Sequence, residues 1–430
     1  MSNVRLLTQP LTFTEQSMVK NRIFKSAMSE QLGDKNYAPT EQLVHLYRVW
    51  AQGGTGLLVT GNVMVDRTAL GEPKNVVLDK DADLTMFSEW ATAGTEQNTQ
   101  LWMQLNHPGK QTPKFLSEEP VAPSAVPLAK ALQSSFNTPR ALTESEIFDI
   151  VERFAVAAER AKEAGFSGVQ IHGAHGYLVS QFLSPHHNRR EDNWGGSLEN
   201  RMRFVREIYQ AIRKRVGEDF PIGIKLNSAD FQKGGFAEED SIVVMKTLQD
   251  DGIDLIEISG GNYENPSMMN GKTSVKGPKT QGEQSKADKQ QTPKASTVAR
   301  EAYFLEYAEK AQQVLTIPLV VTGGFRSAPA MEQALQSKAT DMIGIARPLA
   351  VNPRLSQQLI DDENHRMRLK PLTTGVKALD FASMLNITWY EQQLKLIGHG
   401  KATKPNMSTW LSVFRTFAGM GRAAFKKRRA

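Results

Sequence analysis

Short apolar segments alternate with longer amphipathic ones along most of the chain. Eight apolar segments have the length of strands, and some, such as GLLVT and PLVVTGG, are almost wholly hydrophobic. Runs of this kind are typical of parallel strands that are buried on both faces. The predicted strands are Arg22–Ala27, Thr55–Asn62, Thr99–Asn106, Gly168–Gly173, Ile222–Asn227, Leu255–Ser259, Pro318–Thr322 and Asp341–Ala346.

Helical patterns follow most of these strands. The clearest begins at Thr143, where Thr143 and Glu146 have the spacing of a capping box, and its apolar positions repeat every 3.6 residues until Gly165. Eight strand–helix alternations predict an α/β fold of the (β/α)8 TIM barrel type. A doubly wound open sheet is the alternative that strands alone do not exclude.

Two parts of the chain lie outside this repeat. Residues 262–297 are rich in Gly, Lys, Gln, Ser and Pro, and they predict a long loop after the sixth strand. That loop follows the carboxyl end of a strand, which is the face where barrels carry their active sites. The barrel is expected to occupy residues 1–361, and residues 362–430 are expected to form a non-barrel C-terminal extension.

The basic character of the chain is confined to its end. The formal net charge is +6, but residues 392–430 contain nine Lys or Arg and no Asp or Glu, so the body carries −3. Nucleic acid is therefore not an expected partner. Within residues 392–430, the stretch 410–424 contains both apolar and basic residues. It predicts either an amphipathic helix on an anionic membrane surface or a helix packed on the barrel or on a second subunit.

Composition excludes several kinds of chemistry. The chain has no cysteine, which rules out disulfides, thiolate zinc sites, Cys-ligated iron–sulfur clusters and a catalytic thiol. The first residues lack the apolar core of a signal peptide, and no apolar run approaches the ~18–20 residues of a membrane span. We expect a cytoplasmic protein, with peripheral membrane contact through the basic tail as an addition.

Proton donors crowd the end of the fourth predicted strand. His172, His175 and Tyr177 lie within six positions directly after the apolar residue Ile171. Two imidazoles that donate to one carbonyl oxygen would stabilise enolate-like charge, and the phenol would act as the general acid. The alternatives are a metal pair, two satisfied core histidines and an aromatic residue on the rim. The spacing is not the helical zinc spacing and no third ligand is evident, so no metal is expected.

The last two strands end in features that suit a phosphate. Gly323 and Gly324 form a turn, and Arg347 follows the neighbouring strand. Gln104 ends another strand and offers both a donor and an acceptor, as the pyrimidine edge of a flavin requires. Lys225 could balance charge on a reduced flavin.

These segments together resemble the old yellow enzyme family of FMN-dependent NAD(P)H:flavin oxidoreductases, and its bacterial branch in particular. The matching motifs extend from about Leu7 to Asp361, and the most specific lies in the block that begins at His172 and includes GGSLENR. The motifs are KNRIFKSAM, WMQLNHPGKQ, AAERAKEAGFSGVQIHGAHGYLVSQFLSP, NRREDNWGGSLENRMRF, LIEISGG, TGGFRS and IGIARPL.

The resemblance implies an enzyme that binds FMN, takes electrons from NADH or NADPH and reduces the activated C=C bond of an enone or a similar α,β-unsaturated carbonyl compound by ping-pong hydride transfer. His172 and His175 would hold the carbonyl oxygen, and Tyr177 would protonate the α-carbon. The implied cofactor-binding residues are Ala27, Met28, Ser29, Gly61, Gln104, Lys225, Gly323, Gly324, Phe325, Arg326, Ala346 and Arg347.

Other functions stay open beside this one. They are a flavin-holding or membrane-docked binding protein with little turnover, and a flavin barrel that acts on another substrate such as RNA uridine. The intact histidines and tyrosine disfavour the first, and the absence of cysteine disfavours the second. Three positions depart from the family pattern, namely Ser29, Gln31 and Lys225, and they put the flavin potential and the substrate preference in question. A homodimer is compatible with an enzyme of this size.

Overall fold

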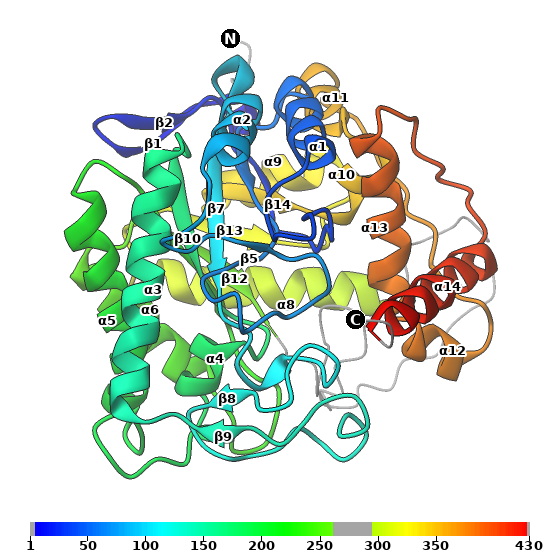
Figure 1. The fold of residues 1–430 in the computed structure, drawn as a ribbon. Helices are drawn as coiled ribbons and strands as arrows, with labels where there is room; N and C mark the ends of the chain where they lie inside the picture. The colour runs from blue at the N-terminus through cyan, green and yellow to red at the C-terminus, as the bar shows by residue number, and fades with distance from the viewer. Residues whose placement is uncertain (1–4, 261–294, 428–430) are drawn as a thin grey trace, which may run out of the picture.

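Eight parallel strands close into a barrel in the computed structural model, which describes residues 5–260 and 295–427 (Figure 1). Strand β10 pairs with both β7 and β11, and β14 pairs with β3, so the sheet has no open edge between them. The fold is the predicted (β/α)8 barrel, and the open-sheet alternative is wrong. The strands are β3 (Ile23–Lys25), β4 (Leu57–Val59), β7 (Gln100–Asn106), β10 (Gly168–Gly173), β11 (Ile222–Asn227), β12 (Leu255–Ser259), β13 (Leu319–Thr322) and β14 (Met342–Ile345).

Three observed strands, β10, β11 and β12, have the predicted bounds, whereas β4 is much shorter than predicted. The residues after Val59 leave the ladder because side chains take over their hydrogen bonds. The N–H of Gly61 donates to Glu30 Oε1 at 3.2 Å and to the Tyr47 hydroxyl at 3.1 Å. The chain therefore turns over the barrel earlier than its hydrophobicity indicates.

Helices cover the outside of the barrel. The predicted capping box is confirmed, since Thr143 Oγ1 accepts from the Glu146 N–H and the Glu146 side chain accepts from the Thr143 N–H. Gly165 follows with φ +93°, a value that favours glycine. The covering helices are α1 (Glu41–Gln52), α2 (Thr85–Gly94), α3 (Glu144–Glu163), α5 (Leu198–Val216), α6 (Glu238–Asp251), α8 (Ala295–Gln312), α9 (Ala328–Gln336), α10 (Arg347–Val351) and α11 (Leu355–Asp361).

A hairpin of β1 (Leu11–Thr14) and β2 (Ser17–Val19) lies at the amino ends of the barrel strands. Phe13 packs against Trp102 at 5.1 Å between ring centres, in a separate apolar cluster that includes Leu57 and Leu255. This cluster fills the end of the barrel at which the strands begin. Figure 1 shows the hairpin at the opposite end of the molecule from α4, β8 and β9.

Short elements surround the carboxyl ends of the strands. They come from the loops, so this end of the barrel is built from segments that are far apart in the sequence. The elements there are β5 (Val63–Met64), β6 (Val76–Val77), β8 (Val121–Ala122), β9 (Arg140–Ala141) and α4 (Leu178–Leu183). The 3-10 turn η3 (Gly109–Gln111) also lies there, whereas η1 (Leu6–Thr8) and η2 (Glu96–Asn98) lie at the amino ends of β3 and β7.

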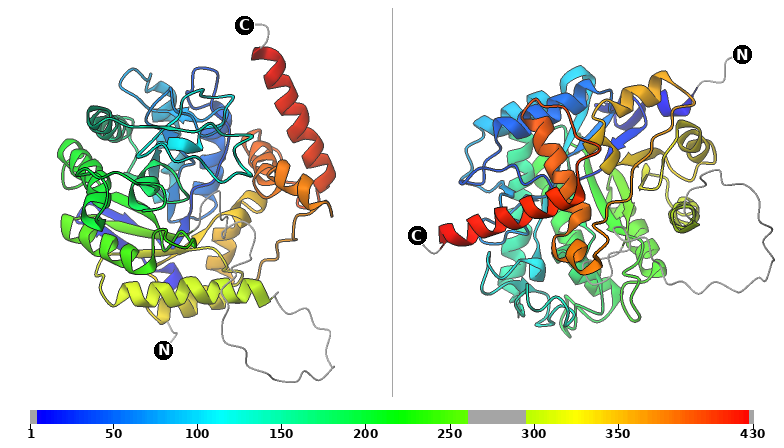
Figure 2. Two further views of the ribbon diagram at one scale, coloured as in Figure 1. Left: turned by 90° about the horizontal axis from the view of Figure 1, so that it is seen from below. Right: turned by 90° about the vertical axis from the view of Figure 1, so that its right-hand side faces the viewer.

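The end of the chain forms three helices, α12 (Lys377–Ala382), α13 (Leu385–Gly398) and α14 (Thr409–Lys427). Trp389 and Leu394 of α13 belong to the same hydrophobic core as the barrel helices, and α13 packs on α1 and α10. The stretch predicted at 410–424 is confirmed as a helix, α14, which extends away from the barrel in both views of Figure 2.

The predicted loop 262–297 lies outside the described residues except for its last three positions. Those three positions belong to α8, so the loop prediction was too long at this end. Among the described helices, none combines the length and the apolar character needed to cross a bilayer.

Candidate active site

The three predicted proton donors converge beyond the end of β10. His172 lies within β10, and His175 follows in a tight turn because its φ is +61° and that of Gly176 is +77°. The rings of His172 and His175 lie 5.1 Å apart, and the ring of Tyr177 lies 4.8 Å from that of His172. One strand and one turn therefore bring all three side chains to the same place.

Both imidazoles are neutral near pH 7. Burial, together with His175 and Lys225, holds the pKa of His172 well below its usual value. Burial and then Lys225 lower the pKa of His175 to about 3. The Ala174 N–H donates to His172 Nδ1 at 3.3 Å, so the proton of this ring resides on Nε2. His172 is therefore a neutral hydrogen-bond donor through Nε2.

The orientation of the other two donors is set by residues at the carboxyl ends of two other strands, β12 and β4. His175 Nε2 lies 2.6 Å from the Ser259 hydroxyl at the end of β12. Tyr177 is 5% exposed and precedes α4, and its hydroxyl accepts from Asn62 Nδ2 at 3.4 Å. Ser259 and Asn62 were not among the predicted catalytic residues, although both stand at strand ends in the sequence.

A buried polar network crosses the barrel below these rings. Gln104 Nε2 donates to Gln170 Oε1 at 2.7 Å, and Gln170 Nε2 donates to Glu257 Oε2 at 2.9 Å. Glu257 Oε1 accepts from Lys225 Nζ at 3.1 Å and from the Thr322 hydroxyl at 2.7 Å. The network links two predicted residues, Gln104 and Lys225, through two that sequence reasoning missed. These two are Gln170 and Glu257. The sequence feature that could have revealed them is a single polar residue between apolar ones in a strand, as in VQI and IEI.

The turn after β13 and the start of α10 form a second group. Gly323 and Gly324 have φ values of +102° and +85°, and a Cβ added at Gly323 would meet no atom within 4 Å. Arg326 Nη1 donates to the Phe325 carbonyl at 2.7 Å and so braces this turn. Ala346 precedes α10 and is half-buried.

Arg347 is the first residue of α10 and is half-buried. Within residues 5–260 and 295–427 its guanidinium makes no ion pair or hydrogen bond, and its only recorded partner is the Tyr390 ring at 6.0 Å. A desolvated cation without a carboxylate beside a glycine turn is suited to an anionic ligand.

The turn after β3 forms a third group. Ala27, Met28 and Ser29 are half-buried there, and Gly61 approaches so closely that an added Cβ would lie 2.5 Å from the Met28 carbonyl oxygen. The Ser29 hydroxyl contacts Glu72 and lies 2.7 Å from Glu391 Oε1. Glu391 comes from α13, and no local pattern in the sequence indicates this contact.

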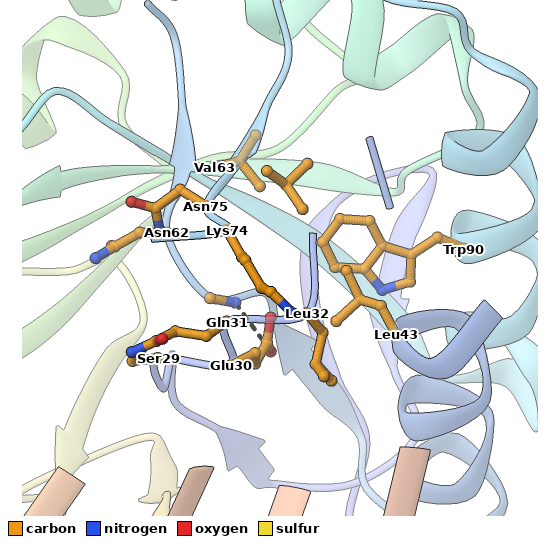
Figure 3. A pocket seen from close by; sticks show the side chains of 12 residues that line it. Ser29, Glu30, Gln31, Leu32, Leu43, Asn62, Val63, Lys74, Asn75 and Trp90 are labelled. Carbon is orange, nitrogen blue, oxygen red and sulfur yellow. Dashed lines mark hydrogen bonds between the residues drawn. The ribbon is translucent and has the colours of Figure 1, made fainter. Parts of the chain in front are cut away.

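A small pocket opens beside this turn (Figure 3). Polar Ser29 and Gln31 lie on one side of the pocket, and apolar Leu43 and Trp90 lie on the other. In the part of the chain that the structure describes, no group of three or more His, Cys, Asp or Glu side chains is arranged to hold a metal ion.

Comparison with known proteins places the chain in a family. Residues 6–366 match the NADH:flavin oxidoreductase / NADH oxidase family. The chain belongs to this family, which includes the old yellow enzymes. It is therefore an oxidoreductase, and its cofactors are FMN and a nicotinamide nucleotide.

The individual matches agree with this assignment. The chain is 36% identical to the NADH-dependent flavin oxidoreductase iliE of Neonectria sp. (strain DH2) over 370 residues, which are 82% of this chain and 46% of that protein. It is 36% identical to the iliE protein of Hypocrea jecorina (strain QM6a) over 384 residues, 84% of this chain and 89% of that one. An old yellow enzyme homologue from Zymomonas mobilis has the same fold, with a TM-score of 0.67, 23% identity and coverage of 85% and 94%.

The old yellow enzyme cofactor fits the residues present. Gln104 Oε1 is buried and has no hydrogen-bond partner among the described residues, although Gln104 Nε2 is paired with Gln170. An orphaned buried acceptor of this kind indicates a missing donor, and a flavin ring N–H is one. The N–H groups of Gly324 and Phe325 donate to no described residue, and they lie beside the open space at Gly323. Together with Arg347 they suit the FMN phosphate.

Proposed function

We propose that this flavin oxidoreductase reduces the activated C=C bond of α,β-unsaturated carbonyl compounds with NADH or NADPH as the electron donor. The observation that carries the proposal is the convergence of two neutral, desolvated imidazoles and a phenol beyond β10, with ring separations of 5.1 and 4.8 Å. When bound, FMN supplies the hydride that it has taken from the nicotinamide. Because donor and acceptor use one pocket in turn, the kinetics are ping-pong.

The residues that we assign to FMN come from the turn after β3, from the buried polar network, and from the turn after β13 with the start of α10. The turn after β3 and the approach of Gly61 contact the ring system, Gln104 and Lys225 bind its pyrimidine edge, and the β13 turn with Arg347 binds the phosphate. The full assignment is Ala27, Met28, Ser29, Gly61, Gln104, Lys225, Gly323, Gly324, Phe325, Arg326, Ala346 and Arg347.

His172 and His175 hold the carbonyl oxygen of the substrate in this proposal. Neutral donors are suited to this role, because they stabilise the negative charge that develops on the oxygen and do not themselves protonate it in the ground state. One hydrogen-bond donor to such an oxyanion typically increases the rate by a factor of roughly 10²–10³. In the proposal the Ser259 hydroxyl donates to His175 Nε2, 2.6 Å away, and fixes the ring, so the proton of His175 resides on Nδ1 and is donated from there to the substrate oxygen.

Tyr177 donates the proton to the α-carbon. The Asn62 amide donates to this hydroxyl at 3.4 Å and positions the phenol beside His172, whose ring lies 4.8 Å away. General-acid catalysis by a positioned group contributes typically 10²–10⁴-fold.

Anaerobic stopped-flow spectroscopy of the FMN-loaded protein tests this function. NADH or NADPH should bleach the flavin absorption, and 2-cyclohexenone added afterwards should restore it. A His172→Ala/His175→Ala double variant, which removes both donors, should still bleach but recover at least 100-fold more slowly. A protein that bleaches but recovers only with oxygen, and with no activated alkene, would contradict the proposal.

We also propose that α14 contacts an anionic lipid surface. Trp410, Phe414 and Phe417 are 54, 70 and 41% exposed, and their spacing places them on one face of the helix. Arg415 is exposed on the same helix, and the chain has no acidic residue after Glu391. An apolar face with basic neighbours is complementary to acidic headgroups.

Sedimentation with vesicles tests this contact. The protein should bind phosphatidylglycerol vesicles and not phosphatidylcholine vesicles, and Phe414→Ser/Phe417→Ser should lose the binding. Phe381→Ser on α12 is the control, since Phe381 is 61% exposed and lies on another helix. Absence of binding to the phosphatidylglycerol vesicles would contradict the lipid contact. A wild-type dimer in light scattering that the double variant loses would show that a second copy of the chain covers this face.

A further inference from the structure

Two carboxyl groups meet at the hydroxyl of Ser29. Glu391 Oε1 lies 2.7 Å from Ser29 Oγ, and Glu72 Oε2 contacts the same oxygen. Gln31 Nε2 donates to Glu391 Oε1 at 3.0 Å. Ser29 and Gln31 belong to the turn after β3, Glu72 follows β5, and Glu391 lies in α13. The contact therefore joins the C-terminal extension to a barrel loop.

The number of hydrogens decides how this contact is made. A serine hydroxyl has one hydrogen, so it donates to only one of the two carboxyl groups. Glu391 Oε1 also accepts from Gln31. The contact that the serine hydrogen does not serve requires a hydrogen from a protonated carboxyl group, which donates to Ser29 Oγ. The arrangement therefore contains one acidic proton shared by Glu72 and Glu391.

The surroundings favour retention of that proton. Burial, followed by the charge of Glu72, raises the pKa of Glu391 to about 8. Burial also raises the pKa of Glu72. Neither carboxyl group has an ion pair among residues 5–260 and 295–427. A pair of close carboxyl groups without a cation holds one proton near neutral pH.

Helix α13, which contains Glu391, also lies beside the other end of the proposed flavin pocket. Tyr390 precedes Glu391 in α13, and its ring lies 6.0 Å from the Arg347 guanidinium. Helix α13 packs on α10, which begins with Arg347, and on α1. Two consecutive residues of the extension therefore contact Ser29 and Arg347, which are assigned to the ring and the phosphate of FMN.

We propose that Glu391 is a positioning residue of the flavin pocket. Through the proton that it shares with Glu72 it holds the turn at Ser29 against α13, and loss of this proton releases the turn and weakens FMN binding. The inference depends on the proposed function for the place of FMN in the pocket. In the ionised pair, two unpaired carboxylates face each other across Ser29, and their repulsion opposes the ordered turn.

Titration of the apoprotein with FMN at pH 6.5 and pH 9, followed by quenching of flavin fluorescence, tests this inference. For the wild type we expect the Kd to rise about fivefold, because a difference of one unit in the pKa of Glu391 between free and bound states is a factor of ten in affinity, of which about half is reached at pH 9. Glu391→Gln keeps an acceptor for Ser29 but carries no charge, so its Kd should rise less than about threefold. Glu363→Gln, at an exposed position, should behave as the wild type.

Other groups on elements packed against this site also titrate or carry charge. They are present in the wild type and in the variant, so they cancel in the comparison. They are Lys25, Glu30, Glu41, His45, Tyr47, Arg48, Lys74, Arg326, Arg347, Lys377, Asp380, Tyr390, Lys395 and Arg415.

Glu72→Gln provides a second test that does not alter α13, and it should also lose the pH dependence. Equal pH dependence of the Kd in the wild type, Glu391→Gln and Glu72→Gln would overturn the positioning role, even if enone reduction is normal. Failure of the proposed function has a different signature: tight FMN binding with the expected pH dependence, but no reoxidation by activated alkenes. A wild type that binds no FMN at either pH would overturn both.

Discussion

Lys225 and Glu257 form an ion pair inside the barrel. Their charged atoms lie 3.1 Å apart on the adjacent strands β11 and β12, and the two side chains are 4 and 0% exposed. Glu257 also accepts from Gln170 and Thr322, so its charge is fully hydrogen-bonded. The cation assigned to the flavin ring is therefore held in one position before any ligand arrives, as preorganised electrostatic catalysis requires.

Removal of the carboxylate should destabilise the fold. Glu257→Ala leaves the buried ammonium of Lys225 without a partner, and breaking a buried pair in this way costs about 3–5 kcal/mol. Urea unfolding followed by tryptophan fluorescence would measure this loss in the free energy of unfolding. Glu257→Gln retains hydrogen-bonding groups and should lose less. A Glu257→Ala protein as stable as the wild type would show that the pair contributes nothing to the fold.

The hydroxyl of Tyr177 should matter in only one half-reaction. Tyr177→Phe removes the proposed proton donor and leaves the edge-to-face contact of the ring with His172, so reoxidation of the flavin by 2-cyclohexenone should slow roughly 10²–10⁴-fold. Flavin reduction by NADH should change less than about threefold. Single-turnover stopped-flow measurements separate the two steps. Equal losses in both steps would refute the general-acid assignment.

Loss of the Arg347 guanidinium should weaken FMN binding without unfolding the protein. A hydrogen bond to a charged group contributes about 1.5–3 kcal/mol, so Arg347→Ala should raise the Kd for FMN roughly ten- to hundredfold. The apoprotein should melt within a few degrees of the wild type, because Arg347 has no described ion pair to lose. Arg354→Ala, at an exposed position, is the matched control. An unchanged Kd would place the phosphate elsewhere.

A buried histidine should make the fold sensitive to acid. Burial lowers the pKa of His107 to about 4, whereas the pKa of a histidine in the unfolded chain is about 6.5. The folded value lies below the unfolded one, so as the pH falls through this window the unfolded state takes up the proton first and the folded state loses stability. At pH 5 the loss is about 2 kcal/mol.

The comparison with His107→Asn isolates this effect from the carboxyl groups that titrate in the same range. Between pH 7.5 and pH 5 the free energy of unfolding should shift by about 2 kcal/mol in favour of the variant. Urea titrations at the two pH values provide the measurement. A stability difference that does not vary with pH would mean that His107 is protonated in the fold as readily as in the unfolded chain.

Much of the barrel could be predicted from the sequence because its signals are local. A strand buried on both faces is mostly apolar, and the segments at β10, β11 and β12 show this apart from the polar residues of the buried network, such as Gln170, Lys225 and Glu257. The cluster of His172, His175 and Tyr177 was predictable for the same reason, since six consecutive positions and one tight turn bring the rings together. The bounds of β4 could not be predicted, because the side chains of Glu30 and Tyr47 accept from the Gly61 N–H and end the hydrogen-bond ladder of this strand.

The sequence by itself determined which segments form the barrel and which proton donors stand at the end of β10, because short-range periodicity and chain order decide both. Only the tertiary structure decided that Glu257 neutralises Lys225 and that Glu391 reaches Ser29. The second contact joins residues 362 positions apart. Such pairs depend on how strands and helices pack, and a hydrogen bond between distant side chains leaves no pattern in either local segment.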